Sequence, residues 1–357
     1  MWLFNSSIGK KFIMALTGIC LVLFVTFHVL MNAVAIIWPG AYNVVCQFLG
    51  ANWYALIASM GLGLLFVIHI IDALVLTVQN RKARGNDRYA VNARPKTVEW
   101  SSQNMLVLGI VVLLFLGLHL VQFWARMQYQ ELIGSTYVAN GVEVPPAAGT
   151  LFLQLAFQSW WTPVLYIIGF IALWFHMNHG FWSMWQSVGW DNATWLPRLK
   201  CISAWWVSIV CGLFALQAVV FGVRAHTDYY VNDPALRSQY IEMYQEHFEH
   251  ANAPLMDELT SLQIELQGLQ SGETKVADPI VRQSEIYARA QEIQGELQAN
   301  QAKMMECIMG IDKIAKCPAC AEEKAVEQLT EPAPEATPEP AAEELSEEVE
   351  TEGVALD

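Results

Sequence analysis

The amino-acid sequence predicts an all-α membrane protein in which five transmembrane helices are followed by an external helical tail. Five apolar stretches are each long enough to cross a bilayer core, which takes about 20 helical residues. Lys and Arg concentrate in alternate loops between these stretches, as in membrane proteins of fixed orientation. The apolar residues lie almost wholly before residue 225 and the acids mostly after it, in a chain that is 54% hydrophobic with a net charge of −14. We therefore expect a membrane part followed by a polar appendage.

The predicted spans run over residues 12–37, 54–79, 104–125, 161–185 and 203–223. Lys10 and Lys11 precede the first span, as basic residues precede a secretory signal. A signal has an apolar region of about 7–15 residues, and the first span is longer than that. We therefore expect it to remain in the protein as a transmembrane helix.

The distribution of basic residues predicts the orientation. The loop 38–53 has no charged residue, and 127–160 has only Glu131 and Glu143. The other two loops and the N-terminus carry Lys10, Lys11, Arg81, Lys82, Arg84, Arg88, Arg94, Lys96, Arg198 and Lys200. Because cytoplasmic loops carry the excess of Lys and Arg, we expect a cytoplasmic N-terminus. Five spans then place the tail on the outer side of the membrane.

Three regions follow: a membrane domain over 1–225, an external helical extension over 226–330 and a disordered acidic tail over 331–357. Within the extension, 234–268 and 279–316 have helical composition and are separated by a Gly- and Pro-containing break, which favours two antiparallel helices. The last region is Pro/Ala/Glu-rich with ten acids and no base, a composition typical of disorder.

The cysteines of the tail are Cys307, Cys317 and Cys320. No His follows the CxxC at 317–320, so a c-type haem attachment site is excluded, and a zinc site lacks a fourth ligand. On the oxidising side of a membrane a disulfide among these three is the favoured interpretation, and a redox role for the CxxC is the alternative. The cysteines of the spans are expected to pack as small apolar groups.

Each of the first four spans carries a histidine about 15 residues from the side at which the chain enters the membrane. These histidines are His28, His69, His119 and His176, with His179 as a second histidine in the fourth span. At about 1.5 Å per residue each lies roughly 23 Å from its entry side. Since consecutive spans run in opposite directions, His28 and His119 share a level near the outer face, and His69 and His176 share one near the inner face. The levels differ by roughly 15 Å if the core is about 30 Å thick.

Two histidine pairs at two depths favour two b-type haems, because haem iron takes axial imidazoles from opposite sides of a flat ring. Zinc or copper would require more ligands gathered at one depth. A proton relay would need carboxylates, which the spans almost lack. Structural histidines bonded to neighbouring carbonyls are the remaining alternative. The expected fold is thus a haem-binding four-helix bundle with the fifth helix peripheral to it.

Other polar residues near the histidines have more than one interpretation each. Asp72 is either a helix-end group that reaches the inner interface or a residue that supports His69 or handles protons. Asn32 and Gln122 either orient a histidine, bond a quinone or hold helices together. Arg126 either pairs with a haem propionate or extends its charged end to the interface.

Several motifs resemble the single-subunit, five-helix cytochrome b anchor of succinate dehydrogenases and quinol:fumarate reductases, especially the form in Bacteroides-like bacteria. The resemblance covers residues 1–225 and includes one histidine per helix in order. The matching runs are Ser6-Ser7-Ile8-Gly9-Lys10-Lys11, Met14-Ala15-Leu16-Thr17-Gly18, Asn80-Arg81-Lys82-Ala83-Arg84, Trp100-Ser101-Ser102-Gln103-Asn104-Met105 and His176-Met177-Asn178-His179-Gly180-Phe181-Trp182-Ser183.

This resemblance implies two haem b groups, the outer one held by His28 and His119 and the inner one by His69 and His176. Gly180 and Gly189 match the family's spacing from the fourth ligand and favour His176, with His179 as the alternate. It also implies menaquinone as substrate, and a flavoprotein with FAD and an iron–sulfur subunit bound on the cytoplasmic face. The location implied is the inner membrane of a bacterium, with the tail in the periplasm. The chain would then be a non-catalytic subunit of the enzyme, with a dimer of complexes left open and no nucleic-acid partner expected.

Two departures from the family limit what carries over. The loop 38–53 lacks the acid found near the outer haem in some fumarate reductases, and Trp174 occupies the place of a second glutamate. The quinone site, the proton coupling and the tail are therefore not predicted by the resemblance. Two other functions stay open: a dihaem anchor for another respiratory oxidoreductase, such as a formate dehydrogenase or hydrogenase, and a haem-free transporter or scaffold.

Overall fold

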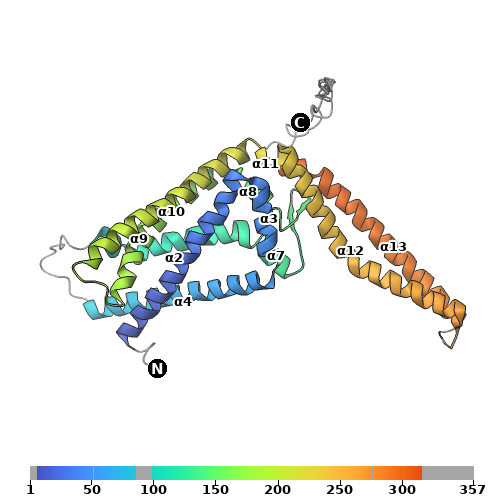
Figure 1. Cartoon of the computed structure of the whole chain (residues 1–357), viewed down its shortest axis with the longest axis horizontal. Helices are drawn as coiled ribbons and strands as arrows, with labels where there is room; N and C mark the ends of the chain where they lie inside the picture. The colour runs from blue at the N-terminus through green and yellow to red at the C-terminus, as the bar shows by residue number, and fades with distance from the viewer. Residues whose placement is uncertain (1–5, 51, 86–98, 273, 275–276, 316–357) are drawn as a thin grey trace, which may run out of the picture.

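The computed structural model is that of an all-α membrane protein and describes residues 6–50, 52–85, 99–272, 274 and 277–315. Within them, five helices are long and apolar enough to cross a membrane, as the sequence predicts. These are α2 (Ser7–Ile37), α4 (Trp53–Arg84), α6 (Met105–His119) with its continuation η1 (Leu120–Trp124), α9 (Trp161–Gln186) and α10 (Trp195–His226). Figure 1 shows them side by side, with α2 crossing the others obliquely.

The spans extend beyond their predicted limits where local sequence allows it. The helix α2 starts at Ser7 because the Ser6 side chain accepts a hydrogen bond from the Gly9 amide at 2.9 Å, which caps the helix. The helix α10 starts at Trp195, eight residues before the predicted 203, so Arg198 and Lys200 lie within its first turns. Pro197 is compatible with this start, because a proline in the first turn removes no intrahelical hydrogen bond.

Two segments predicted as loops contain further structure. The segment 38–53 forms α3 (Pro39–Gly50), which starts with a proline at its first position and is too short to span a membrane. The segment 127–160 forms α7 (Gln128–Leu132), a hairpin of β1 (Tyr137–Ala139) and β2 (Val142–Val144), and α8 (Gly149–Phe157). Almost every side chain of α8 is buried, which accounts for the absence of charge in that helix. A short α5 (Trp100–Gln103) precedes α6.

The base of the tail packs into this end of the bundle through a buried polar network. Asn43 of α3 accepts hydrogen bonds from the Thr150 amide at 2.9 Å and from the Thr150 hydroxyl at 2.8 Å. Thr150 also contacts the Tyr240 hydroxyl at 2.7 Å, and that hydroxyl donates to the Tyr230 carbonyl at 2.9 Å. Tyr230 lies in α11 (Tyr229–Asn232) and Tyr240 in α12 (Pro234–Ser271). The tail therefore starts as part of the membrane domain's core and not as a detached appendage.

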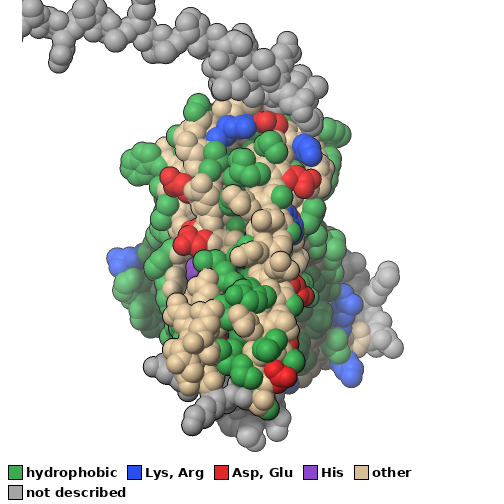
Figure 2. All heavy atoms as spheres, turned by 90° about the vertical axis from the view of Figure 1, so that its right-hand side faces the viewer, with side chains coloured by type: hydrophobic (Ala, Val, Ile, Leu, Met, Phe, Trp, Pro, Cys, Tyr) green, Lys and Arg blue, Asp and Glu red, His purple; other side chains and the backbone are tan. Residues whose placement is uncertain are grey.

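Beyond its base, the tail is an antiparallel hairpin of α12 and α13 (Pro279–Met309) that projects from the bundle in Figure 1. Leucines recur on α12 at alternating spacings of four and three residues, as in a coiled coil. They are Leu255, Leu259, Leu262, Leu266 and Leu269. Asn252 and Asn300 are hydrogen-bonded across the hairpin at 2.7 Å, a polar pair of the kind that fixes register. Figure 2 looks onto this side of the molecule, where polar and acidic groups interrupt the hydrophobic ones.

Ion pairs fasten the hairpin along its length and at its base. Glu258 binds Arg289 and Glu265 binds Arg282 through two hydrogen bonds each. At the base, Lys303 of α13 lies 2.7 Å from Glu143 of β2. The predicted second helix of 279–316 ends earlier, at Met309, and is followed by a 3₁₀ turn, η2 (Ile311–Ile314). Cys317, Cys320 and the predicted disordered tail 331–357 lie outside the described residues.

The helices α6 and α9 approach closely at Gly169. A Cβ atom added there would lie 2.5 Å from Cγ of Phe115, closer than real contacts allow. The Phe115 ring in turn packs against Tyr166 and Phe170, with ring centroids 5.1 and 5.3 Å away. The absence of a side chain at Gly169 thus sets the distance between two of the histidine-bearing spans.

We predict that Gly169→Ala destabilises the protein by about 1–3 kcal/mol, the usual cost of overpacking a core. The check is the thermal unfolding midpoint in detergent. Gly61→Ala in α4 is the matched control, because no atom lies within 4 Å of a Cβ added there. If Gly169→Ala unfolded at the same temperature as Gly61→Ala or above it, the close packing of α6 on α9 would be wrong.

Candidate functional site

The structure brings the four span histidines together as two facing pairs. The rings of His28 on α2 and His119 on α6 have centroids 5.7 Å apart and planes at 83°. The rings of His69 on α4 and His176 on α9 have centroids 6.4 Å apart and planes at 65°. We refer to them as the tail-side pair (His28 and His119) and the N-terminal-side pair (His69 and His176). Each pairing is the one that the depth count along the sequence predicts.

The helix α2 shows how far apart the two pairs lie. It contributes His28 to the tail-side pair, and its Thr17 contacts His69 of the other pair. Thr17 and His28 are 11 residues apart, just over three full turns, so they lie on the same face of α2. At about 1.5 Å per residue they are separated by roughly 16 Å along the helix. One face of α2 therefore lines both sites.

Around His119, a tyrosine and a glutamine form a short hydrogen-bonded chain. The Tyr166 hydroxyl donates to Oε1 of Gln122 at 2.8 Å and lies 3.3 Å from Nδ1 of His119. Gln122 belongs to η1, the π-helical turn that follows His119 directly, and such turns often occur at functional sites. Tyr166 and Gln122 are both buried. Gln122 therefore reaches the histidine through Tyr166, which refines its predicted role in orienting a histidine.

His28 is contacted by Asn32, one turn further along α2. Nδ2 of Asn32 lies 3.2 Å from Nε2 of His28 and donates to the His28 carbonyl at 2.9 Å. Oδ1 of Asn32 accepts from the Tyr42 hydroxyl at 3.1 Å. The Phe24 ring stacks on the other side, with centroids 5.3 Å apart. Asn32 thus contacts His28 directly, as the interpretation that it orients a histidine predicts.

The helix α10 lines the tail-side pair, so the expectation that the fifth span is peripheral is wrong. The Phe214 ring of α10 lies 6.1 Å from the His28 ring, centroid to centroid. Gln217, buried one turn later, donates to the Val29 carbonyl at 2.8 Å. The expectation was based on the lack of a histidine in the fifth span at the level of the pairs. A span can nevertheless line a site with apolar and amide side chains alone.

In the N-terminal-side pair, the two Nδ1 atoms differ: that of His69 has a hydrogen-bond partner, and that of His176 has none among the described residues. Nδ1 of His69 lies 3.0 Å from the Thr17 hydroxyl. Nδ1 of His176 is buried without a hydrogen-bond partner among the described residues. Glycines lie beside both rings: added Cβ atoms would lie 4.0 Å from His69 at Gly18 and 3.6 Å from His176 at Gly109.

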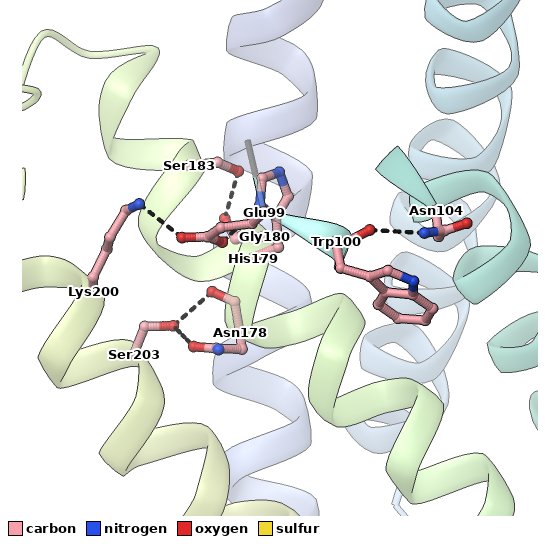
Figure 3. Close-up of polar contacts among 9 residues, drawn as sticks. All are labelled: Glu99, Trp100, Asn104, Asn178, His179, Gly180, Ser183, Lys200 and Ser203. Atoms are coloured by element: carbon pink, nitrogen blue, oxygen red, sulfur yellow. Dashed lines mark hydrogen bonds and ion pairs between the residues drawn. The ribbon is translucent and has the colours of Figure 1, made fainter. Parts of the chain in front are cut away.

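The second histidine of α9, His179, faces a different set of groups (Figure 3). Its Nδ1 lies 3.6 Å from Oε2 of Glu99, and its ring packs edge-on against Trp182. Glu99 also accepts a hydrogen bond from Lys200 at 2.7 Å. Burial alone would raise the pKa of Glu99, but Lys200 and His179 outweigh it and lower that pKa. The ring paired with His69 is that of His176, which favours His176 over His179 as the fourth site residue.

The centroid separations of both pairs, 5.7 and 6.4 Å, are of the size expected for two imidazoles bound to one metal ion. Metal–imidazole bonds of about 2.0 Å place two rings on opposite sides of a metal with centroids about 6 Å apart. Haem iron needs two such axial ligands, because the macrocycle supplies the other four. Within the described part of the chain, no three or more His, Cys, Asp or Glu side chains form a group that could hold a metal ion.

Two other residues proposed from the sequence, Asp72 and Arg126, have no hydrogen bond to the four histidines among the described residues. Asp72, one turn beyond His69, is buried, and its Oδ2 has no hydrogen-bond partner among the described residues. The guanidinium of Arg126 lies 4.9 Å from the centroid of the Tyr137 ring in β1. Cys307 is buried in α13 as a free thiol, and its predicted disulfide partners lie outside the described residues.

Two residues with polar contacts to the histidine rings, Thr17 and Tyr166, were not singled out as site residues in the sequence. Thr17 could have been found, because its spacing of 11 residues from His28 places it on the histidine face of α2. Tyr166 gives no such signal: it lies ten residues before His176, nearly three turns away on α9, but its partner is His119 on another helix. Only the packing of α6 against α9 brings it to that ring.

Comparison of the chain with protein-family models, curated proteins and solved structures gives no match.

Proposed function

We propose that this chain is the membrane anchor and electron-carrying subunit of a quinol:fumarate reductase or succinate dehydrogenase. In this proposal it holds two b-type haems and connects menaquinone with an iron–sulfur partner in the cytoplasm. The observation that carries the proposal is the pairing of four imidazoles from four different spans, with centroids 5.7 and 6.4 Å apart. Buried ionisable groups in a membrane span are costly and usually serve a site.

The side chains around the pairs supply orientation and insulation. Thr17 and Tyr166 hold one ring of each pair, and Asn32 contacts a third. Apolar rings such as Phe214 pack beside the tail-side pair and keep water away. Bound haem would supply the one-electron chemistry. The chain would thus carry electrons without reducing fumarate itself.

The proposed orientation has the N-terminus in the cytoplasm and the tail in the periplasm of a bacterial inner membrane. Basic residues at the end of the bundle that holds the N-terminus of the chain support this orientation. The described ones are Lys10, Lys11, Arg81, Lys82, Arg198 and Lys200. Arg88, Arg94 and Lys96 lie outside the described residues. This basic end is the proposed docking side for the iron–sulfur subunit and the FAD-containing flavoprotein.

We predict that the purified chain shows the reduced-minus-oxidised spectrum of haem b, with two haems per chain. His28→Ala or His69→Ala should each remove about half of the haem, because each breaks one axial pair. The double variant should remove nearly all of it. The measurement is the haem-to-protein ratio in detergent, and full haem retention in the double variant would contradict the assigned ligands.

His179→Ala serves as the discriminating control for the fourth ligand. Because the His176 ring faces His69 and the His179 side chain faces Glu99, we expect His176→Ala to lose one haem and His179→Ala to keep both. Haem loss in His179→Ala with full retention in His176→Ala would reverse the assignment.

The identity of the enzyme complex is tested by the subunits that co-purify with the full chain. We predict a flavoprotein with FAD, an iron–sulfur subunit and quinol-dependent fumarate reduction. Co-purification of a molybdenum or nickel enzyme would instead support a dihaem anchor of the formate dehydrogenase or hydrogenase type. A purified chain without haem would support a transporter or scaffold.

A further inference from the structure

The hydrogen bonds of Thr17 determine which nitrogen of His69 carries the proton. A threonine hydroxyl has one hydrogen to donate. That of Thr17 is directed to backbone carbonyls one turn earlier, those of Ile13 at 2.9 Å and Met14 at 3.1 Å. Carbonyl oxygens can only accept, so the Thr17 oxygen must act as the acceptor toward His69. Nδ1 of His69 therefore carries the hydrogen at their 3.0 Å contact, and Nε2 keeps its lone pair.

The same reasoning from a single hydroxyl hydrogen applies to Tyr166 at the tail-side pair. Its hydroxyl hydrogen is donated to Oε1 of Gln122 at 2.8 Å. The tyrosine oxygen is then the acceptor at its 3.3 Å contact with Nδ1 of His119. His119 is thus also held with a hydrogen on Nδ1 and a free lone pair on Nε2. Two unrelated residues on different helices produce the same tautomer at two depths.

Among the described residues, the second ring of each pair has no such hydroxyl partner. Nδ1 of His176 is unbonded there. Nε2 of His28 is contacted by the amide nitrogen of Asn32, which can only donate, so His28 also carries its hydrogen on Nδ1. Each pair thus combines one ring whose Nδ1 is bonded to a hydroxyl oxygen with one that lacks this bond. Hydrogen bonds to the outer nitrogen of a metal-bound histidine fix its tautomer and orientation and raise its basicity.

We propose that Thr17 and Tyr166 are positioning residues that present Nε2 of His69 and His119 to the two haem irons. This inference rests on the proposed function, because it assigns a role in haem ligation. Each residue serves one site only: Thr17 the N-terminal-side pair and Tyr166 the tail-side pair. Loss of one hydroxyl should therefore alter one haem and leave the other unchanged.

The test compares Thr17→Val and Tyr166→Phe in the full chain by potentiometric titration of both haems. His69→Ala and His119→Ala first establish which titration component belongs to which pair. We expect Thr17→Val to raise the midpoint potential of the N-terminal-side haem alone, because a less basic imidazole stabilises oxidised iron less well. Haem affinity at that site should fall about tenfold or more. Tyr166→Phe should do the same at the tail-side haem alone.

Two further variants separate positioning from a general structural effect. Thr17→Ser keeps the hydroxyl and should restore the wild-type potential. Thr26→Val removes a hydroxyl of α2 that donates only to the Val22 carbonyl, and should leave both haems unchanged. If both haems were present and neither potential moved in Thr17→Val and Tyr166→Phe, the inference would fail while the proposed function stood. A wild-type chain without haem would overturn both.

Discussion

Four imidazoles are buried within membrane-spanning helices, and the arrangement of these helices depends on giving each imidazole a partner. An ionisable ring in hydrocarbon is costly unless it has a partner, and each of these four faces a second imidazole from a neighbouring span. The pairs link α2 to α6 and α4 to α9. Pairing of the rings therefore requires these spans to keep their relative depth, because sliding one helix by a turn would move its ring about 5 Å from its partner.

The helix α2 is the element common to both sites, and the rest of the fold holds it in place. Gln217 of α10 binds the Val29 carbonyl next to His28, and Arg224 donates to the carbonyls of Ala35 and Ile36 at the end of α2 at 2.7 and 2.9 Å. Those carbonyls have no intrahelical partner, so the guanidinium caps the helix. The span without a histidine therefore fixes the position of the helix that lines both pairs.

The sequence predicted the membrane fold, the five spans and the pairing of the four histidines, because hydropathy and depth both follow from counting residues along a helix. It did not predict α3 or α8, because the low charge of their segments was used only to infer the orientation of the spans. It did not predict the burial of the tail's base either, because the tail was set apart by its polar, acid-rich composition. It also missed Tyr166 and the role of α10. Both depend on which helices pack side by side, and a single sequence carries little information on lateral packing. Thr17 was predictable in part: its position on the histidine face of α2 follows from residue spacing, but its contact with His69 depends on the packing of α4 against α2.

The proposed function requires iron between the two rings of each histidine pair. Anomalous scattering at the iron absorption edge, measured on crystals of the purified full-length protein, would locate it. We expect two iron peaks per chain, one between His28 and His119 and one between His69 and His176. Peaks elsewhere, or no iron with the rings directed toward lipid, would contradict the proposed function.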